Sequence, residues 1–514
     1  MNKEKILWAD DEIDLLKPHI LFLENKGYEV HTVNSGTDAI DECNKTSFDL
    51  VILDENMPGL TGLDTLSKIK AMQPSLPIIM ITKSEEEDIM NQAIGGKIAD
   101  YLIKPVNPNQ ILLSIKKNLH VNEIISEKNT SGYRQAYNSI SQDINFAQTY
   151  EDWIDIYQKI THWEIELENA DKSLMELLKM QKNEANSIFS KFIKKNYHDW
   201  IKGIDSPLMS HGLFKSKVFP TLDKGEKVFV ILIDNLRFDQ WRTIKPILDQ
   251  WYNCQEELYC SILPTATQYA RNAIFSGLMP NDIVKNYPEL WVDDIDEEGK
   301  NLHEEELIQT LLDRYRRKES FSYAKINENA FGEKYITNLR NINKNQINIA
   351  VINFIDMLSH ARTDSKMIRE LASSESAYRA LTRTWLEHSS TMELFKQLAE
   401  SDYKVIITTD HGTIKVDNAI KVIGDRETNT NLRYKIGKTL DYNPKQVYEI
   451  KQPSYYGLPS LNLSSTYIFA TNRDFFAYPN NYNYYVGYYR DTFQHGGISM
   501  EEMLVPWVTL TPKK

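Results

Sequence analysis

The sequence is poor in cysteine and lacks any long apolar run. Its 514 residues include only three cysteines, none in a Cys-x-x-Cys pair: Cys43, Cys254 and Cys260. This argues against a disulfide framework and fits a reducing compartment. No apolar stretch is long enough to span a bilayer, and the one near the N-terminus is too short for a signal peptide. We therefore expect a cytoplasmic protein without a membrane span.

The sequence also lacks an excess of positive charge, because its formal net charge is −13. Broad binding of duplex DNA requires a basic surface, so we expect no duplex DNA as a partner. The sequence shows no zinc finger, basic zipper or convincing helix-turn-helix pattern. A local basic groove for a short nucleotide remains compatible with this composition.

Three regions of different pattern indicate a multidomain α/β protein. Residues 1–120 alternate short apolar strands with helical stretches, which predicts a doubly wound, flavodoxin-like parallel sheet. Residues 121–215 contain one proline and show apolar residues at helical spacing, so we expect an all-helical bundle that acts as a linker. Residues 216–514 return to long apolar strands, three of which run into an aspartate, and this indicates a second buried parallel sheet.

A tyrosine- and asparagine-rich run, YPNNYNYYVGYYRD, occupies residues 478–491. We expect it to form one or two exposed strands and a turn, because tyrosine favours strands and asparagine favours turns. The alternative is an aromatic wall that faces a substrate.

Polar residues end or follow the predicted strands of residues 1–120, and they include Asp10, Asp11, Asp54, Thr82 and Lys104. The carboxyl ends of parallel strands meet at one edge of a sheet. Three carboxylates there would repel one another without a cation, and their oxygens suit Mg²⁺. Asp54 would then accept a phosphoryl group whose charge Mg²⁺ and Lys104 offset. Thr82 would hydrogen-bond that group, and Tyr101 would follow it inward.

This set resembles the receiver domain of two-component response regulators. The alternative is a doubly wound domain whose acidic loops meet by chance, which the agreement of several motifs in order disfavours. One position departs from the family pattern: Lys83 stands where receivers usually carry a small residue. A bulky cation at this position would alter phosphate access or lifetime.

Aspartates and histidines gather at the predicted strand ends of residues 216–514. The set comprises Asp234, Asp356, His360, Asp410, His411 and His495. Carboxylate and imidazole together suit Zn²⁺, although the same ligands accept Mn²⁺. Six ligands are too many for one tetrahedral zinc, whereas two ions about 4 Å apart would use them all. Such a pair contacts both the attacking and the leaving oxygen of a phosphoryl transfer.

A nucleophile is expected near these ligands, and the segment LPTATQYARN provides Thr265 and Thr267 before a helical stretch. A helix N-terminus favours an anion, and metal coordination lowers the pKa of a hydroxyl. The alternative is ordinary N-capping by a threonine.

These motifs resemble the alkaline phosphatase superfamily, specifically its PglZ branch, over residues 216–514. The resemblance implies an alkaline-phosphatase-like α/β fold with Thr267 as the nucleophile. It assigns one zinc ion to Asp234, Thr267, Asp410 and His411. It assigns the second zinc ion to Asp356, His360 and His495.

One position departs from the phosphodiesterase-type relatives, which place an asparagine three residues after the nucleophile to bind a phosphate oxygen. Here that position is Ala270, followed by Arg271 and Asn272. Either neighbour could bind phosphate instead, depending on helix phase. A threonine nucleophile favours a diester substrate by analogy with the nucleotide phosphodiesterases.

The order of receiver (1–120), helical linker (121–215) and PglZ domain (216–514) resembles PorX-type response regulators of Bacteroidota. The resemblance implies a cognate sensor histidine kinase, a homodimer on phosphorylation of Asp54, and a link to type IX secretion. It also implies zinc-dependent phosphodiesterase activity on cyclic and linear oligonucleotides, and contact with a sigma factor or a secretion component. The alternative is a docking protein whose metal-stabilised PglZ domain is not catalytic.

Overall fold

The computed structural model describes residues 3–513 except 75, 84–97, 120–129, 169–171, 294–299, 340–343, 426–427 and 461–463. The chain forms two compact units. One comprises Met1–Tyr137 and Asp171–Met180, and the other comprises Asn138–Ala170 and Gln181–Lys514. The domain boundary predicted at residues 120–121 lies outside the described residues. Within the part of the chain that is described, no helix has the length and apolar character needed to cross a membrane.

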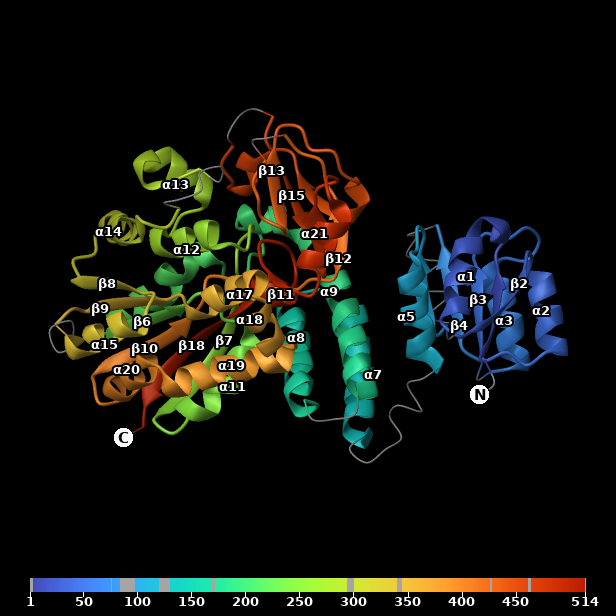
Figure 1. Ribbon diagram of the computed structural model, residues 1–514, viewed down its shortest axis with the longest axis horizontal. Helices are drawn as coiled ribbons and strands as arrows, with labels where there is room; N and C mark the ends of the chain where they lie inside the picture. The colour runs from blue at the N-terminus through green and yellow to red at the C-terminus, as the bar shows by residue number, and fades with distance from the viewer. Residues whose placement is uncertain are drawn as a thin grey trace. The chain divides into compact units, whose positions relative to one another are not determined.

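The first unit contains a five-stranded parallel sheet in the order β2-β1-β3-β4-β5 (Figure 1). Its strands are β1 (Lys5–Ala9), β2 (Glu29–Val33), β3 (Leu50–Asp54), β4 (Ile78–Thr82) and β5 (Asp100–Ile103). Helices α2 (Gly36–Lys45) and α3 (Gly62–Met72) share one apolar core with the sheet. Helices α1 (Lys17–Asn25) and α5 (Pro108–Leu119) share the other core. The predicted doubly wound sheet is therefore confirmed.

The predicted helical linker is also confirmed, with helices α7 (Thr130–Phe146), α8 (Tyr150–Glu166) and α9 (Lys172–Ile201). Helix α8 begins at a capping box in which Thr149 and Asp152 satisfy each other's backbone amides. The ring of Trp153 in α8 packs 5.3 Å from that of Phe189 in α9. These apolar contacts explain the helical spacing of aromatic residues in the sequence.

The second unit is built on a six-stranded sheet in the order β7-β18-β10-β6-β9-β8. Strands β10, β6, β9 and β8 are parallel, as predicted, whereas β18 runs antiparallel to β10 and β7 runs antiparallel to β18. The strands are β6 (Lys227–Ile233), β7 (Tyr252–Cys260), β8 (Phe321–Ile326), β9 (Ile347–Ile352), β10 (Tyr403–Thr408) and β18 (Leu504–Pro512). Strands β6, β9 and β10 are apolar and almost wholly buried, which explains their continuous hydrophobic runs.

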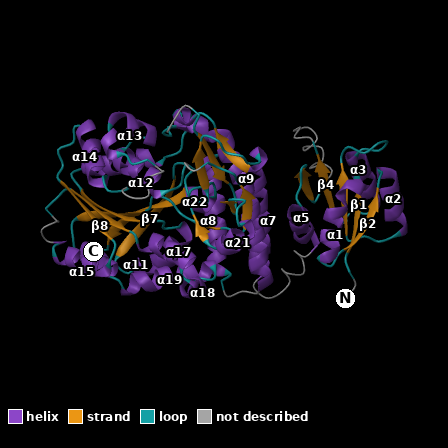
Figure 2. Cartoon of the chain, turned by 45° about the horizontal axis from the view of Figure 1, so that its top comes forward, coloured by secondary structure: helices purple, strands orange, loops and turns teal. Residues whose placement is uncertain are grey.

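Helices cover both faces of this sheet, as Figure 2 shows. One face carries α12 (Thr267–Ser276), α13 (Pro280–Asn286) and α14 (Glu304–Arg314). The other carries α11 (Phe238–Leu248), α15 (Asn329–Thr337), α17 (Phe354–Asp364), α18 (Lys366–Leu371), α19 (Glu375–His388) and α20 (Ser390–Ala399). A short helix, α22 (Met500–Met503), precedes β18.

Smaller strand pairs extend the second unit beyond the main sheet. Strands β13 (Tyr434–Gly437), β15 (Thr466–Ala470) and β14 (Val447–Ile450) form an antiparallel sheet. Strand β12 (Asn418–Lys421) pairs with β16 (Asp474–Ala477), and β11 (Ile414–Lys415) pairs with β17 (Phe493–Gln494). The β11–β17 pair joins the segment after His411 to the segment before His495.

The tyrosine-rich run does not form the strands we expected. Residues Tyr482–Tyr489 form helix α21 instead. Tyr482, Val486 and Tyr489 pack against a small apolar cluster at helical spacing. Tertiary packing thus overrides the strand propensity of tyrosine.

Candidate functional site

The carboxyl ends of the first unit's strands bring together the predicted acidic cluster. Carboxylate oxygens of Asp10, Asp11 and Asp54 lie within 4.8 Å of one another. The ammonium of Lys104 lies 2.8 Å from Asp10 Oδ2 and 3.0 Å from Asp54 Oδ1. Burial raises the pKa of Asp54, and Lys104 opposes this rise. Three carboxylates beside one lysine form an oxygen-rich donor set that fits Mg²⁺.

Two further predicted residues, Thr82 and Tyr101, lie on neighbouring strands of this sheet. Thr82 is buried at the end of β4, and a hydrogen bond links it to Tyr101 on β5. Burial raises the pKa of Tyr101, and this hydrogen bond opposes the rise. Lys83, the departure from the family pattern, forms an ion pair with Glu12 at 2.9 Å, and its side chain is 60% exposed.

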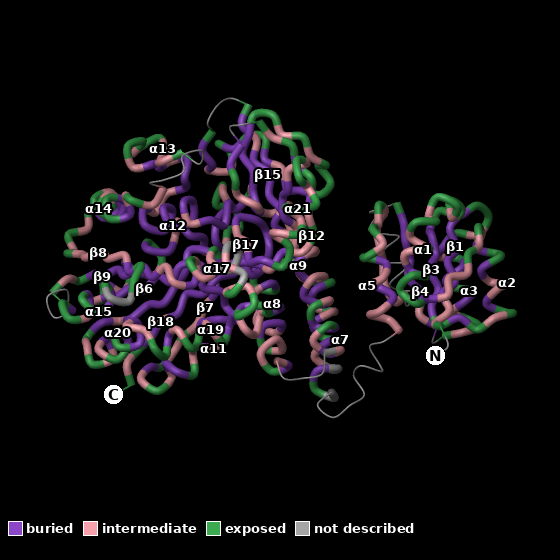
Figure 3. The backbone as a smooth tube through the Cα atoms, in the orientation of Figure 1, coloured by how far each residue is buried: buried purple, intermediate pink, exposed green. Residues whose placement is uncertain are grey.

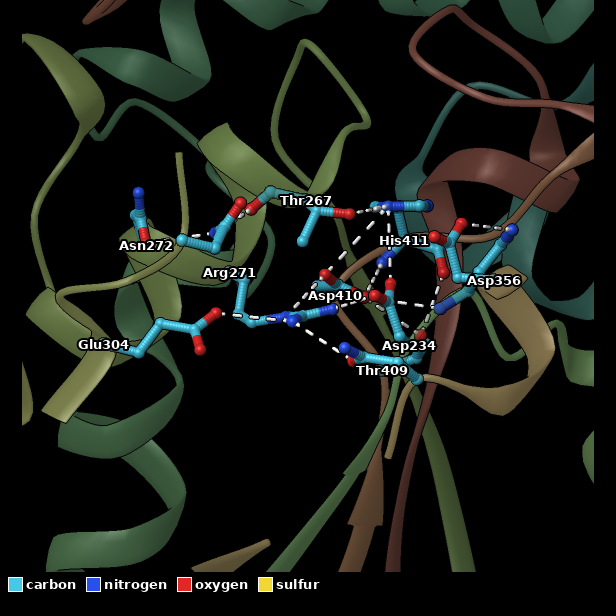
Figure 4. A network of polar contacts seen from close by, with 12 residues as sticks. Asp234, Thr267, Arg271, Asn272, Glu304, Asp356, Thr409, Asp410 and His411 are labelled. Atoms are coloured by element: carbon cyan, nitrogen blue, oxygen red, sulfur yellow. Dashed lines mark hydrogen bonds and ion pairs between the residues drawn. The ribbon is translucent and has the colours of Figure 1, made fainter. Parts of the chain in front are cut away.

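In the second unit, the ends of neighbouring parallel strands bring together a first cluster of candidate metal ligands. Asp234 follows β6, and Asp410 and His411 follow β10, which pairs with β6. Ligand atoms of these three residues lie within 4.8 Å of one another, and all three are buried. Thr267 begins α12, and its Oγ1 lies 3.1 Å from His411 Nε2 (Figure 4).

A second cluster comprises Asp356, His360 and His495, whose ligand atoms also lie within 4.8 Å of one another. We expected Asp356 to end a strand, but β9 ends at Ile352 and Asp356 lies in the first turn of α17. His360 is one turn further along α17, 3.5 Å from Asp356. Their i,i+4 spacing puts both side chains on one face of the helix.

The two clusters adjoin each other. The rings of His411 and His495 stack with their centroids 4.2 Å apart. Asn235, next to Asp234, donates through its side chain to Asp356 Oδ1 at 3.3 Å and through its backbone to Asp410 Oδ1 at 3.4 Å. It has a positive φ of 64°. No sequence pattern indicates this bridging position, beyond its place after the strand-ending aspartate.

Backbone contacts fix which nitrogen of each stacked histidine carries a lone pair. His411 Nδ1 lies 3.1 Å from Gly412 O, and His495 Nδ1 lies 3.2 Å from Thr265 O. Because a carbonyl can only accept, each Nδ1 is the donor, and Nε2 of the neutral ring is the nitrogen whose lone pair a metal ion at the cluster would use. Burial and the neighbouring His411 lower the pKa of His495 to about 3, so this ring stays neutral. The tautomers therefore fit a metal ion at each cluster.

An arginine that the sequence suggested for phosphate binding lies within the first cluster. The buried guanidinium of Arg271 contacts Asp234, lies 3.0 Å from Asp410 and lies 3.3 Å from Glu304. Burial tends to raise the pKa of Asp410, but Arg271 and His411 outweigh it and hold that pKa at about 2. Arg271 thus offsets part of the buried negative charge of the cluster.

The other suggested phosphate-binding residue is not brought into the cluster. The side-chain amide of Asn272 donates to Lys300 O at 3.4 Å, and Figure 4 shows it directed away from the two aspartates. Asn301 contacts both Asn272 and the backbone oxygen of Thr267. Sequence reasoning missed Asn301 because it lies in no strand-end motif.

Comparison with known protein families finds matches to three successive regions of the chain. The description "BREX system PglZ alkaline phosphatase-like domain" matches residues 213–510, more than half of the chain. The chain belongs to the PglZ family. The PorX response regulator linker domain matches residues 123–201, and the response regulator receiver domain matches residues 6–116. The chain is therefore a response regulator of PorX-type architecture with a PglZ effector domain.

Curated relatives match the receiver region. The alginate biosynthesis regulatory protein AlgB of Pseudomonas syringae pv. tomato is 34% identical over 123 residues, which are 24% of this chain and 28% of AlgB. ResD of Bacillus subtilis is 32% identical over 115 residues, which are 22% of this chain and 48% of ResD. The chain thus spans less than half of each of these relatives. Among solved structures, the chain is similar to chemotaxis protein CheY4 of Vibrio cholerae, with 28% sequence identity and a TM-score of 0.22. The match covers 23% of this chain and 100% of the CheY4 chain.

In the PglZ domain, helix α22 contacts the loops of both clusters. The amide of Gly412, next to His411, donates to Glu502 O at 3.2 Å. A Cβ at Gly412 would collide with the α22 backbone, so the close approach requires glycine. The amide of Gly497, two residues beyond His495, donates to Glu502 Oε1 at 2.9 Å. One short helix therefore positions a loop from each cluster.

Linker helix α9 holds α22 through buried polar contacts, which we call the α9–α22 clamp. Asn186 accepts from the amide of Met500 at 2.7 Å and donates to Glu501 Oε2 at 2.9 Å. The ammonium of Lys182 lies 2.9 Å from Glu501 Oε1 and 2.8 Å from Glu164 Oε1. The linker is thus part of the structure that supports the PglZ site.

Proposed function

We propose that the PglZ domain is a zinc-dependent phosphodiesterase that acts on nucleotide or oligonucleotide diesters. One observation carries this proposal: the hydroxyl of Thr267 lies 3.1 Å from His411 Nε2, where two adjoining clusters of carboxylate and imidazole ligands meet. In this proposal, Asp234, Thr267, Asp410 and His411 hold one zinc ion, and Asp356, His360 and His495 hold the other.

The donor chemistry supports two zinc ions. Asp234 Oδ1 is buried and accepts no hydrogen bond from the described residues, so a cation would satisfy it. Both Nε2 lone pairs face the clusters, as the tautomers require. When bound, the ions would offset phosphate charge and lower the pKa of the attacking hydroxyl.

The chemistry that we propose proceeds in two displacements. Thr267 Oγ1 gives up its proton to solvent and attacks phosphorus in line, the bond to the leaving alcohol oxygen breaks, and that oxygen takes up a proton from solvent. The phosphoryl group on Thr267 still carries the other alcohol of the diester. Water then cleaves the bond between Thr267 Oγ1 and phosphorus, which releases a phosphomonoester and restores the hydroxyl. Two inversions give net retention at phosphorus, so inversion of a chiral thiophosphate would contradict the covalent route.

The receiver is the proposed input to this enzyme. A sensor histidine kinase would phosphorylate Asp54 beside Mg²⁺ and Lys104, which adds about −1.5 to −2 charge at the end of β3. Thr82 and Tyr101, already hydrogen-bonded to each other, would then reposition toward the phosphoryl group. We propose that this change favours a homodimer in the cytoplasm and contact with a sigma factor or a type IX secretion component.

The experiment that tests the enzyme compares hydrolysis of bis-p-nitrophenyl phosphate and p-nitrophenyl phosphate by wild type and Thr267→Ala. Metal content is measured on the same samples, and circular dichroism confirms that both fold. We expect about two zinc ions per chain, preferential cleavage of the diester, and loss of cleavage in the variant. Bound metal without cleavage of either ester, even after acetyl phosphate treatment, would refute the enzyme and favour a docking protein.

A further inference from the structure

Helix α21 carries tyrosines that the proposed chemistry does not use. One side of the helix packs against the apolar cluster of Ile414, Val416, Phe475 and Ala477. No residue of α21 is buried, as the colour of its backbone in Figure 3 shows, and Tyr484 is 65% exposed. Aromatic side chains gathered on an exposed helix face commonly mark a binding surface.

Two of these tyrosine rings, those of the exposed Tyr484 and the half-buried Tyr488, form an ordered row. Tyr484 and Tyr488 are one helical turn apart, and their rings lie 6.1 Å apart between centroids with an interplanar angle of 16°. The guanidinium of Arg369, on α18, lies over the ring of Tyr488, 5.3 Å from its centroid. We call these three side chains the α21 ladder. It combines two nearly parallel aromatic rings with a cation at one end.

The two helices that carry the ladder lie close in sequence to residues of the second cluster. Residues 490–494 connect α21 to His495, and residues 361–365 connect His360 to α18. The side chain of His360 on α17 is 66% exposed, so solvent reaches the second cluster at this residue. The amide of Asp491 donates to Val416 O at 2.7 Å, which ties the end of α21 to the segment after β11. Helices α21 and α18, which carry the ladder, are thus each joined to a cluster residue by a short segment of the chain.

We propose that the α21 ladder is a base-stacking subsite for a single-stranded oligonucleotide whose scissile phosphate lies at the two clusters. This inference rests on the proposed phosphodiesterase function. Aromatic rings stack on the faces of all four bases, and an arginine beside them attracts the phosphate backbone. A duplex hides these base faces, so the ladder selects single strands. Stacking also supplies affinity that a chain of net charge −13 cannot obtain from a broad basic surface.

The test uses the full-length protein and compares two substrates, a short oligothymidylate and bis-p-nitrophenyl phosphate. The quantity measured is the ratio of their kcat/KM values, because the small diester lacks the flanking bases. In Tyr484→Ala/Tyr488→Ala we expect this ratio to fall roughly 5- to 150-fold for each stacked base lost. Tyr484→Phe/Tyr488→Phe keeps the rings and should keep the wild-type ratio. The matched control is Tyr455→Ala, which removes a tyrosine that is 62% exposed on the 3-10 helix Pro453–Tyr456.

An unchanged ratio of kcat/KM values in the double alanine variant would overturn the proposed subsite. An equal fall of this ratio in Tyr455→Ala would also overturn it. Failure of wild type to cleave either substrate would instead refute the proposed function. In that case fluorescence anisotropy of labelled oligothymidylate still tests the ladder by itself. Weaker binding by the double alanine variant than by the double phenylalanine variant would support the subsite, and equal binding would overturn it.

Discussion

The α9–α22 clamp predicts that a linker residue sets the zinc affinity of the PglZ site. Asn186→Ala removes the donor to the Glu501 carboxylate and leaves the buried amide of Met500 without its acceptor. Losing a hydrogen bond to a charged group and burying an unpaired amide together cost roughly 2–5 kcal/mol of unfolding free energy. Loosening α22 also releases Gly412 and Gly497, which adjoin the clusters. We therefore expect zinc affinity to fall about 10- to 100-fold, as for other residues that orient metal ligands.

The assay is competition with a chromophoric zinc chelator, performed at a temperature where circular dichroism shows each variant to be folded. The matched control is Asn196→Ala on the same helix, because the Asn196 side chain donates only to Phe192 O within α9 among the described contacts. We expect Asn196→Ala to keep wild-type zinc affinity. Unchanged affinity in Asn186→Ala, or an equal loss in both variants, would refute the positioning role of the clamp.

Two further predictions concern buried charges. Arg271→Met leaves Asp234, Asp410 and Glu304 without their shared cation, so the metal-free protein should lose about 3–5 kcal/mol in urea unfolding. Added zinc should restore part of this stability, and a variant as stable as wild type without metal would contradict the charge argument. Burial lowers the pKa of His211, although Asp282 opposes this decrease. Near pH 6.5, His211 of the unfolded chain therefore takes up a proton that His211 of the folded chain does not. The free energy of unfolding should therefore fall from pH 7 to pH 5, and this residue contributes a slope of at most about 1.4 kcal/mol per pH unit. In His211→Gln, the free energy of unfolding measured in urea should depend less on pH. An unchanged pH dependence would refute this assignment.

The receiver site and the first cluster of the PglZ domain could be predicted in outline because most of their residues end or follow parallel strands. An apolar run such as β6 or β10 is visible in the sequence, and the residues after it must reach the carboxyl edge of the sheet. This rule brings Asp234 next to Asp410 without any knowledge of the loops. It also brings Asp54 next to Lys104 in the receiver sheet.

Other features depend on contacts that no local pattern encodes. Asn186 and Glu501 are 315 residues apart in the chain, so neither predicts the other. The contacts of Arg271 depend on the phase of α12, which the sequence left open between Arg271 and Asn272. The tyrosines of α21 favour strands by propensity, but an apolar cluster formed by β11 and β16 stabilises a helix there.

Helix α22 joins residues 181–201 of α9 to the loops of both clusters within the second unit. Glu502 binds a loop of each metal cluster, and Arg433 forms an ion pair with it at 2.6 Å in a fully buried position. Glu501, the adjacent residue, faces the linker and meets Lys182 and Asn186 there. A buried carboxylate that loses its cationic partner is strongly destabilised, so neither glutamate can shift alone. Displacement of α9 at Lys182 must therefore either move α22 or break its ion pair, and both outcomes alter the loops that carry His411 and His495.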